Sequence, residues 1–265
     1  MGRDERYLQL LLDPVRKCSE YKPKMGTKSG ITLADFEAMH TADPFYSWFG
    51  LDSPLIYAAH KAAGGMTSIY RQIGIGSERL FREILQDELG LSEKQAKWSY
   101  RIPPQGSIGA RTLALDGRID LEDLKNIKDQ ARIRNWIERA AARLNVDEKA
   151  IKTLKGVVFE IRQGYKSKDS KRQNADIANA ATAYTKRYLP AIMLLSTQFD
   201  EDIAQRYQDN RWTILIGNTT GDDLNSTFTF MKDIIGYNLA DFLRRNTRRL
   251  KSTVDEVLKA LLALN

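Results

Sequence analysis

The sequence predicts an α/β protein with a helical N-terminal region. Residues 1–99 have a mostly helical pattern. Three short runs rich in β-branched and other apolar residues, at 155–168, 189–196 and 212–217, have the composition of buried strands. An amphipathic segment separates the first two runs, and a helix between two strands is the usual right-handed crossover that makes them parallel.

Four helices are predicted within residues 1–99. They cover approximately residues 8–17, 33–40, 54–63 and 78–89. Thr32 and Ser77 precede the second and the fourth as N-caps, since their hydroxyl groups can accept from free amides of the first turn. Pro14 interrupts or bends the first helix, and Gly64 with Gly65 follows the third.

Residues 100–265 alternate predicted strands and helices, so we predict a boundary between two regions after residue 99. We expect both regions to form one compact domain overall. A loop at 101–110 leads to a short strand pair, or a strand and turn, at 111–120. Further helices are expected at approximately 121–153, 174–188, 226–251 and 253–264.

The composition excludes several kinds of chemistry. The 41 Lys and Arg residues exceed the 34 Asp and Glu residues by 7, which permits an anionic partner. A single cysteine, Cys18, excludes a disulfide framework and a cysteine-based zinc site, and His40 and His60 are too few for a histidine-rich one. No apolar run has the ~18 residues of a membrane span, and the charged N-terminus is unlike a signal peptide, so we expect a cytoplasmic protein. The glycines at 64–76 lack the lysine of a phosphate-binding loop, so no nucleotide cofactor is expected.

The best candidate for chemistry is a pair of carboxylates. Glu160 and Arg162 are two residues apart on a predicted strand and therefore project from the same face. Charges in an otherwise apolar strand need a partner or an ion. Asp116 lies beside Gly117, where a tight turn can hold its carboxylate at a strand end. If these strands pair, Asp116 and Glu160 converge and offer the oxygen ligands that Mg²⁺ prefers.

A basic, amide-rich segment follows Glu160. Its cations are Arg162, Lys166, Lys168, Lys171 and Arg172. Its amides are Gln163, Gln173 and Asn174, whose side chains suit the edges of adenine, as arginine suits guanine. This segment beside a candidate metal site favours phosphodiester chemistry on DNA.

These residues resemble the PD-(D/E)XK nucleases, the superfamily of many type II restriction endonucleases, in an EcoRI-like layout. LDGRI at 115–119 stands where that family has its first aspartate, and FEIRQGYKSKD at 159–169 stands where it has E-x-K. The resemblance covers roughly residues 110–246. It implies a restriction-endonuclease-like core, a mixed central sheet flanked by helices. It also implies a homodimer that cuts double-stranded DNA with Mg²⁺ held by Asp116 and Glu160.

The sequence departs from this pattern in two respects. Arg162 stands where the family has its lysine, so either Arg162 takes the electrostatic part or Lys166 or Lys168 supplies the lysine from the loop. Asp116 and Glu160 are 44 positions apart (160 − 116), which is wide, and Asp120 is therefore an alternative first ligand. Glu78 is a further candidate carboxylate if its helix packs beside the site.

Simpler interpretations exist for each feature. Glu160 and Arg162 can form a structural ion pair, and the basic segment can be a solvated loop. The arginine-rich stretch 243–251 can contact phosphates or form the polar face of a terminal helix, which we favour slightly. The aromatic stretch 45–57 is expected to be core or a dimer surface rather than a platform for stacked bases. The function classes that remain open are a restriction endonuclease, a nuclease of the same superfamily acting on a DNA structure or repair intermediate, and a non-catalytic basic DNA-binding protein.

Overall fold

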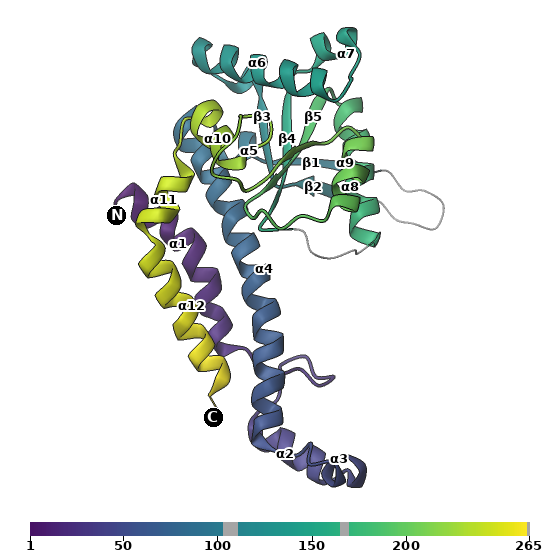
Figure 1. The fold of residues 1–265 in the computed structure, drawn as a ribbon, viewed down its shortest axis with the longest axis vertical. Helices are drawn as coiled ribbons and strands as arrows, with labels where there is room; N and C mark the ends of the chain where they lie inside the picture. The colour runs from purple at the N-terminus through teal and green to yellow at the C-terminus, as the bar shows by residue number, and fades with distance from the viewer. Residues whose placement is uncertain (103–110, 165–169, 264–265) are drawn as a thin grey trace. The chain divides into compact units, whose positions relative to one another are not determined.

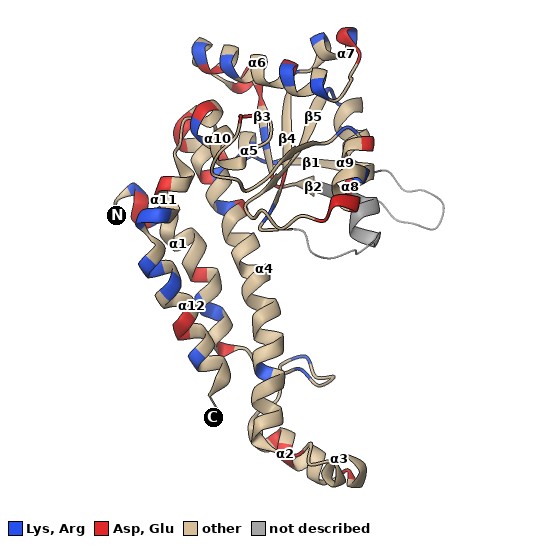
Figure 2. Ribbon diagram, viewed as in Figure 1, with Lys and Arg blue, Asp and Glu red and all other residues tan. Residues whose placement is uncertain are grey.

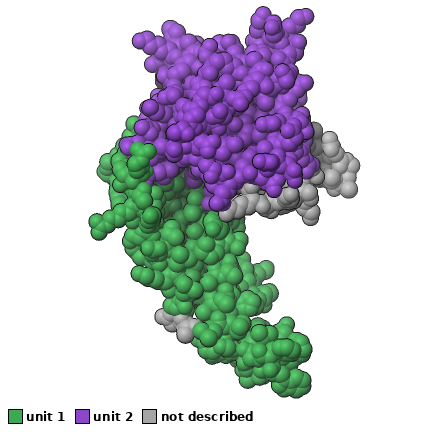
Figure 3. Space-filling model, viewed as in Figure 1, with its two compact units in different colours: residues 1–76, 244–265 green, residues 77–243 purple. Residues whose placement is uncertain are grey.

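The computed structural model describes residues 1–102, 111–164 and 170–263 (Figure 1). The side chains of 102, 111, 113 and 170–175 lie outside this description. The protein has a mixed α/β fold with a helical N-terminal region, as predicted. Its chain divides into two compact units (Figure 3): unit 1 is residues 1–76 with 244–265, and unit 2 is residues 77–243. The sequence places its division at residue 99 instead.

Unit 1 is helical. Its elements are α1 (Arg3–Arg16), the 3-10 helix η1 (Lys17–Glu20), α2 (Leu33–Thr41), α3 (Pro44–Trp48), the first part of α4 (Pro54–Leu89) and α12 (Thr247–Leu262), while α11 (Leu239–Arg245) ends in it. α1 packs on α12, and bidentate ion pairs join Asp4 and Glu5 of α1 to Arg245 at the end of α11 and to Arg249 of α12, respectively. The arginine stretch at 243–251 is thus partly engaged within unit 1.

The helix α4 runs without a break for 36 residues, where the sequence predicts two helices. That prediction was wrong because the glycines mark close contacts rather than helix ends. A Cβ atom on Gly65 would lie 2.5 Å from a methyl carbon of Leu261, and one on Gly76 would lie 3.0 Å from Cα of Leu11. Ser77 is buried inside this helix and is therefore not its N-cap. Thr32, in contrast, forms the predicted N-cap of α2 in a capping box with Asp35.

Unit 2 is built on a four-stranded sheet of order β3–β4–β5–β6. The strands are β3 (Gly117–Asp120), β4 (Gly156–Arg162), β5 (Tyr188–Leu194) and β6 (Thr213–Leu215). β3 is antiparallel to β4, whereas β4, β5 and β6 are mutually parallel, with α8 (Ser170–Thr185) as the crossover between β4 and β5. The three predicted strands and the crossover helix are confirmed. A separate antiparallel pair, β1 (Trp98–Ile102) and β2 (Arg111–Leu115), precedes them.

Helices cover both faces of this sheet (Figure 1). The remaining elements of unit 2 are α5 (Glu93–Ala96), η2 (Leu121–Asp123), α6 (Ile127–Arg143), α7 (Glu148–Thr153), α9 (Glu201–Asp209), α10 (Thr227–Phe230) and the π-helix η3 (Met231–Ile235). Val158 packs in one core cluster with Ala180 of α8 and Tyr207 of α9. On the opposite face, the ring of Phe159 contacts those of Phe81 and Phe230. The even-numbered residues of β4 therefore face α8 and α9, and Glu160 belongs to that set.

None of the helices in the described part of the chain has both the length and the apolar character needed to cross a membrane.

A matched pair of glycines in α4 tests the close contact between α4 and α1. Gly74 has open space where a Cβ would stand, so Gly74→Ala should raise the free energy of unfolding by about 1 kcal/mol through helix propensity. Gly76→Ala places a methyl group against the backbone of Leu11 and should lower it by about 1–3 kcal/mol. Urea denaturation of both variants measures this. Equal stability of the two variants would show that the backbones do not approach at Gly76.

Candidate active site

Asp116 is held next to Glu160 by the pairing of β3 with β4. Its amide donates to the carbonyl oxygen of Phe159 at 2.8 Å, and its own Oδ2 accepts from the amide of Ile161 at 2.8 Å. The carboxylate thus takes the place of a main-chain carbonyl and extends the ladder beyond Gly117. Because the two bonds reach the residues on either side of Glu160, the carboxylates of Asp116 and Glu160 are neighbours.

Glu160 lies at the buried end of a chain of polar contacts. Glu160 is only 7% exposed, and its Oε1 forms an ion pair with Nη2 of Arg162. The same Nη2 lies 3.5 Å from Oδ1 of Asp176 on α8. The hydroxyl of Tyr207 on α9 donates to the other oxygen of Asp176. Arg162 therefore bridges two buried carboxylates on the face of the sheet covered by α8 and α9.

The part of α4 that belongs to unit 2 adds one carboxylate, Glu78, and one guanidinium group, Arg82. Nη1 of Arg82 donates to the carbonyl oxygen of Asp116 at 2.8 Å. Burial, and next the negative charge of Asp116, raise the pKa of Glu78 to about 7. Glu78 also acts electrostatically on Glu160. Glu78, a further candidate carboxylate in the sequence, thus lies within electrostatic reach of Asp116 and Glu160.

The four carboxylates Glu78, Asp116, Glu160 and Asp176, named here the acidic cluster, are crowded together in a poorly solvated place. Burial is the main cause that raises the pKa of Asp116, of Asp176 and, well above its usual value, of Glu160. The charge of Asp116 adds to the shift of Glu160. The guanidinium groups of Arg82 and Arg162, with Arg79 acting on Glu78, are fewer than the four acids, so the site favours bound protons or a bound cation.

The donor set fits a hydrated Mg²⁺ ion better than a fully protein-caged metal. Among the described residues, no group of three or more His, Cys, Asp or Glu side chains is arranged to hold a metal ion. Mg²⁺, however, commonly keeps several waters and takes only one or two carboxylates from the protein. Asp116 and Glu160 are the two adjacent carboxylates, and an added divalent charge would offset the excess of acids.

Asp120, the alternative first ligand, lies elsewhere. It pairs with Gly156 at the far end of β3, four residues along β4 from Glu160. Its Oδ2 accepts from the hydroxyl of Tyr188 at 2.5 Å, and its Oδ1 accepts from the amide of Glu122 at 3.2 Å. The geometry brings Asp116, and not Asp120, beside Glu160.

The predicted DNA-binding and lysine positions are placed only in part. Lys166 and Lys168 lie outside the described residues. Lys171, Arg172, Gln173 and Asn174 belong to the first turns of α8, but their side chains are not described. Gln163 directly follows β4 and is partly exposed. The roles of these residues stay predictions.

The sequence interpretation missed Asp176, Tyr207 and Arg82. Asp176 begins a stripe on α8 with Asn179, Ala180 and Ala183, all of them buried. An acid at the head of an apolar stripe at helical spacing was the available signal. Arg82 follows Glu78 by one helical turn, which places both on the same face of α4.

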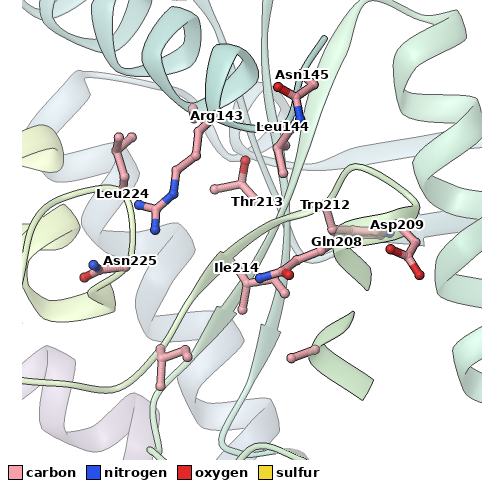
Figure 4. A pocket seen from close by; sticks show the side chains of 13 residues that line it. Arg143, Leu144, Asn145, Gln208, Asp209, Trp212, Thr213, Ile214, Leu224 and Asn225 are labelled. Atoms are coloured by element: carbon pink, nitrogen blue, oxygen red, sulfur yellow. The ribbon is translucent and has the colours of Figure 1, made fainter. Parts of the chain in front are cut away.

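Unit 2 also has a cavity that lies apart from the acidic cluster. A cavity of about 460 Å³ is bordered by the end of α6, by α9, by β6 and by the segment that follows β6 (Figure 4). Arg143 and Asp209 are its charged residues, and Leu144, Ile214 and Leu224 supply apolar surface (Figure 4). The cavity shares no residue with the acidic cluster.

Comparison with protein-family models, with curated proteins and with solved structures finds no match to this chain.

Replacing Glu78 tests the electrostatics of the acidic cluster. The pKa of Glu78 is about 7 in the folded state and about 4.5 in the unfolded chain. Between these two pH values the unfolded chain loses the proton first, so the free energy of unfolding falls as the pH rises. Glu78→Gln removes that cost and should stabilise the protein by about 1–2 kcal/mol above pH 7, a figure reduced because Glu78 is only half-buried. Below about pH 4.5 the difference should vanish. Denaturation in EDTA at both pH values measures it, and a variant of equal stability at pH 8 would contradict the crowding of charges.

Proposed function

We propose that the protein is a Mg²⁺-dependent, sequence-specific DNA endonuclease of the type II restriction class. The observation that carries this proposal is the carboxylate of Asp116, which is hydrogen-bonded into the strand ladder directly beside Glu160. Two adjacent acids at the end of paired strands, with a cation two residues further on, form an arrangement suited to phosphodiester hydrolysis.

The order of elements supports the same proposal. An aspartate precedes a short strand, its antiparallel partner carries Glu160 and Arg162, and a helix then crosses over to a parallel strand. A mixed sheet flanked by helices is also what the resemblance to the PD-(D/E)XK nucleases implies.

In this proposal Asp116 and Glu160 hold Mg²⁺. When bound, Mg²⁺ supplies neutralisation of charge at the scissile phosphate and activation of a water molecule. Arg162 has two carboxylate partners, so it can yield Glu160 while keeping its contact with Asp176. Its permanent charge then serves to stabilise the phosphate during the reaction rather than to accept a proton. Lys166 or Lys168 orients the attacking water.

DNA binding is assigned to the segment that follows β4. Gln163, Lys171, Arg172, Gln173 and Asn174 are proposed to contact double-stranded DNA, the cations at phosphates and the amides at base edges. A palindromic target requires two sites related by symmetry, so we propose a homodimer in which each subunit cuts one strand in the cytoplasm. A nuclease acting on a DNA structure or repair intermediate has the same site and differs only in its target.

A non-catalytic DNA-binding protein of this architecture is a second candidate. It is favoured by one observation, the pairing of Arg162 with both Glu160 and Asp176. Such a network can serve as a structural unit that fastens β4 to α8 without any metal.

Cleavage of phage DNA tests the proposal. Purified protein with Mg²⁺ should cut it into discrete fragments, and Glu160→Ala should abolish cutting while leaving DNA binding in place, because the base-contacting residues lie outside the acidic cluster. Glu138→Ala, which removes an exposed acid of α6, is the matched control and should cut normally. Random degradation instead of discrete fragments would favour a structural target. A fully active Glu160→Ala protein would exclude the site.

Arg162 variants separate catalysis from binding. Arg162→Ala should lower the cleavage rate about 100-fold or more, because a cation facing the phosphate is lost. Arg162→Lys keeps one positive charge beside Glu160 and Asp176 and should lose about tenfold or less, since only the second bond is missing. Single-turnover cleavage with melting curves for each variant measures both effects. Wild-type protein that binds DNA but cleaves none in Mg²⁺ would favour the non-catalytic candidate.

A further inference from the structure

Unit 1 exposes a concentrated set of large apolar side chains. Six exposed residues lie on α2, on α3 and at the entrance to α4, and they are named here the aromatic patch: Met39, Phe45, Tyr46, Trp48, Phe49 and Leu55. Trp48 is 83% exposed and Phe49 69%. The core interpretation of this stretch is therefore wrong for these side chains, whereas Phe36 and Tyr57 are buried beneath them in a small core of their own.

Three of the four rings lie against one another. The ring centroid of Phe45 lies 4.9 Å from that of Phe49 and 6.0 Å from that of Tyr46. Asp43 fixes this turn, since its Oδ1 accepts from the amides of Phe45 and Tyr46. With about 150–250 Å² for a whole aromatic side chain, the four rings expose about 500 Å². An apolar patch of that size on a folded protein marks an interaction site.

The segment that carries the aromatic patch lacks the cations that a polyanion would need, although the charge of Lys22 acts on Asp35 of α2. The sequence from residue 29 to residue 60 contains no Lys or Arg, and Figure 2 shows acidic but no basic residues on α2 and α3. Its acids are Asp35, Glu37, Asp43 and Asp52. A platform for single-stranded nucleic acid needs a positively charged groove beside its aromatic rings, and anionic membranes likewise attract cations.

We propose that the aromatic patch is the surface through which two copies of this chain form a dimer. The rings alone provide most of the roughly 800 Å² that each partner gives to a standard interface, and Met39 and Leu55 add to it. Three of the acids are turned to local donors: Asp35 to Thr32, Asp43 to the first turn of α3, and Asp52 to the hydroxyls of Thr41 and Ser47. The like charges at the rim therefore weaken the contact without preventing it.

The inference rests in part on the proposed function. Each chain contains one acidic cluster, so cutting both strands of a duplex at one site requires two copies. The dimer itself, however, is argued from the patch and is measured without DNA.

The four tryptophans of the chain provide a direct probe. Trp48 is exposed, whereas Trp98, Trp136 and Trp212 are buried. Sedimentation velocity of the full-length protein across a micromolar dilution series should show a dimer that dissociates, and acrylamide should quench Trp48 only in the diluted samples. Raising the salt concentration should tighten the dimer, because it screens the repulsion between the acidic rims.

Two variants and one control make the test specific. Trp48→Glu and Phe49→Ser should weaken dimerisation about tenfold or more, as expected for aromatic residues at the centre of an interface. Ile127→Glu changes an equally exposed apolar residue of α6 and should dimerise like the wild type. Circular dichroism confirms that each variant is folded, and the neutral Phe49→Ser guards against an effect of added charge alone.

Several outcomes would overturn the inference. A wild-type protein that stays monomeric, or variants that dimerise normally, would contradict it. A dimer that weakens as the salt concentration rises would also contradict it. If the fluorescence of Trp48 responds to added DNA and not to dilution, the patch stacks on bases instead. Cleavage by a monomeric protein would remove this inference together with the proposed homodimer, and would leave the proposed Mg²⁺-dependent cleavage of DNA standing. A dimer that cleaves no DNA would do the reverse.

Discussion

The pairing of β3 with β4 is the interaction on which the candidate site depends. This ladder is short, and Asp116 lengthens it by supplying a side-chain oxygen where a carbonyl would stand. The same bond fixes the direction of the carboxylate and places it beside Glu160. A buried carboxylate that accepts a main-chain hydrogen bond is also partly compensated for the loss of water, which allows a second acid to be its neighbour. The hydrogen bond between Asp116 and Ile161 thus fixes both the register of β3 on β4 and the position of the Asp116 carboxylate.

The excess of acid over base then shapes the surroundings. Arg162 is shared by Glu160 and Asp176, and Tyr207 completes the hydrogen bonding of Asp176. Each partner comes from a different element, so β4, α8 and α9 meet at a polar network within an otherwise apolar core. A buried polar network costs free energy unless each of its groups has a hydrogen-bond or ionic partner. Here each carboxylate needs a bound cation, a bound proton or the guanidinium of Arg162 as that partner.

The sequence predicted the strands of the sheet more accurately than the bounds of the helices. Period and composition sufficed for β4, β5 and the crossover α8, because buried parallel strands are apolar throughout. They did not reveal that α4 is continuous, since a glycine that ends a helix and a glycine that admits a neighbouring helix look alike in one sequence. Asp116 and Asp120 were left as alternatives because only the register of β3 separates them. Asp176 was missed because its partners, Arg162 and Tyr207, are 14 and 31 residues away.

The division of the chain has a consequence for how the protein is made. Unit 2 is continuous in sequence, whereas unit 1 needs both residues 1–76 and residues 244–265. On the ribosome, all of unit 2 is synthesised before α12 emerges to meet α1. Domains fold as units during synthesis, so unit 2 can fold while α1 still lacks α12, one of the two helices that pack on its apolar side. The helices of unit 1 are therefore the last to be protected, and a chaperone or protease acting on the nascent chain would find its target there.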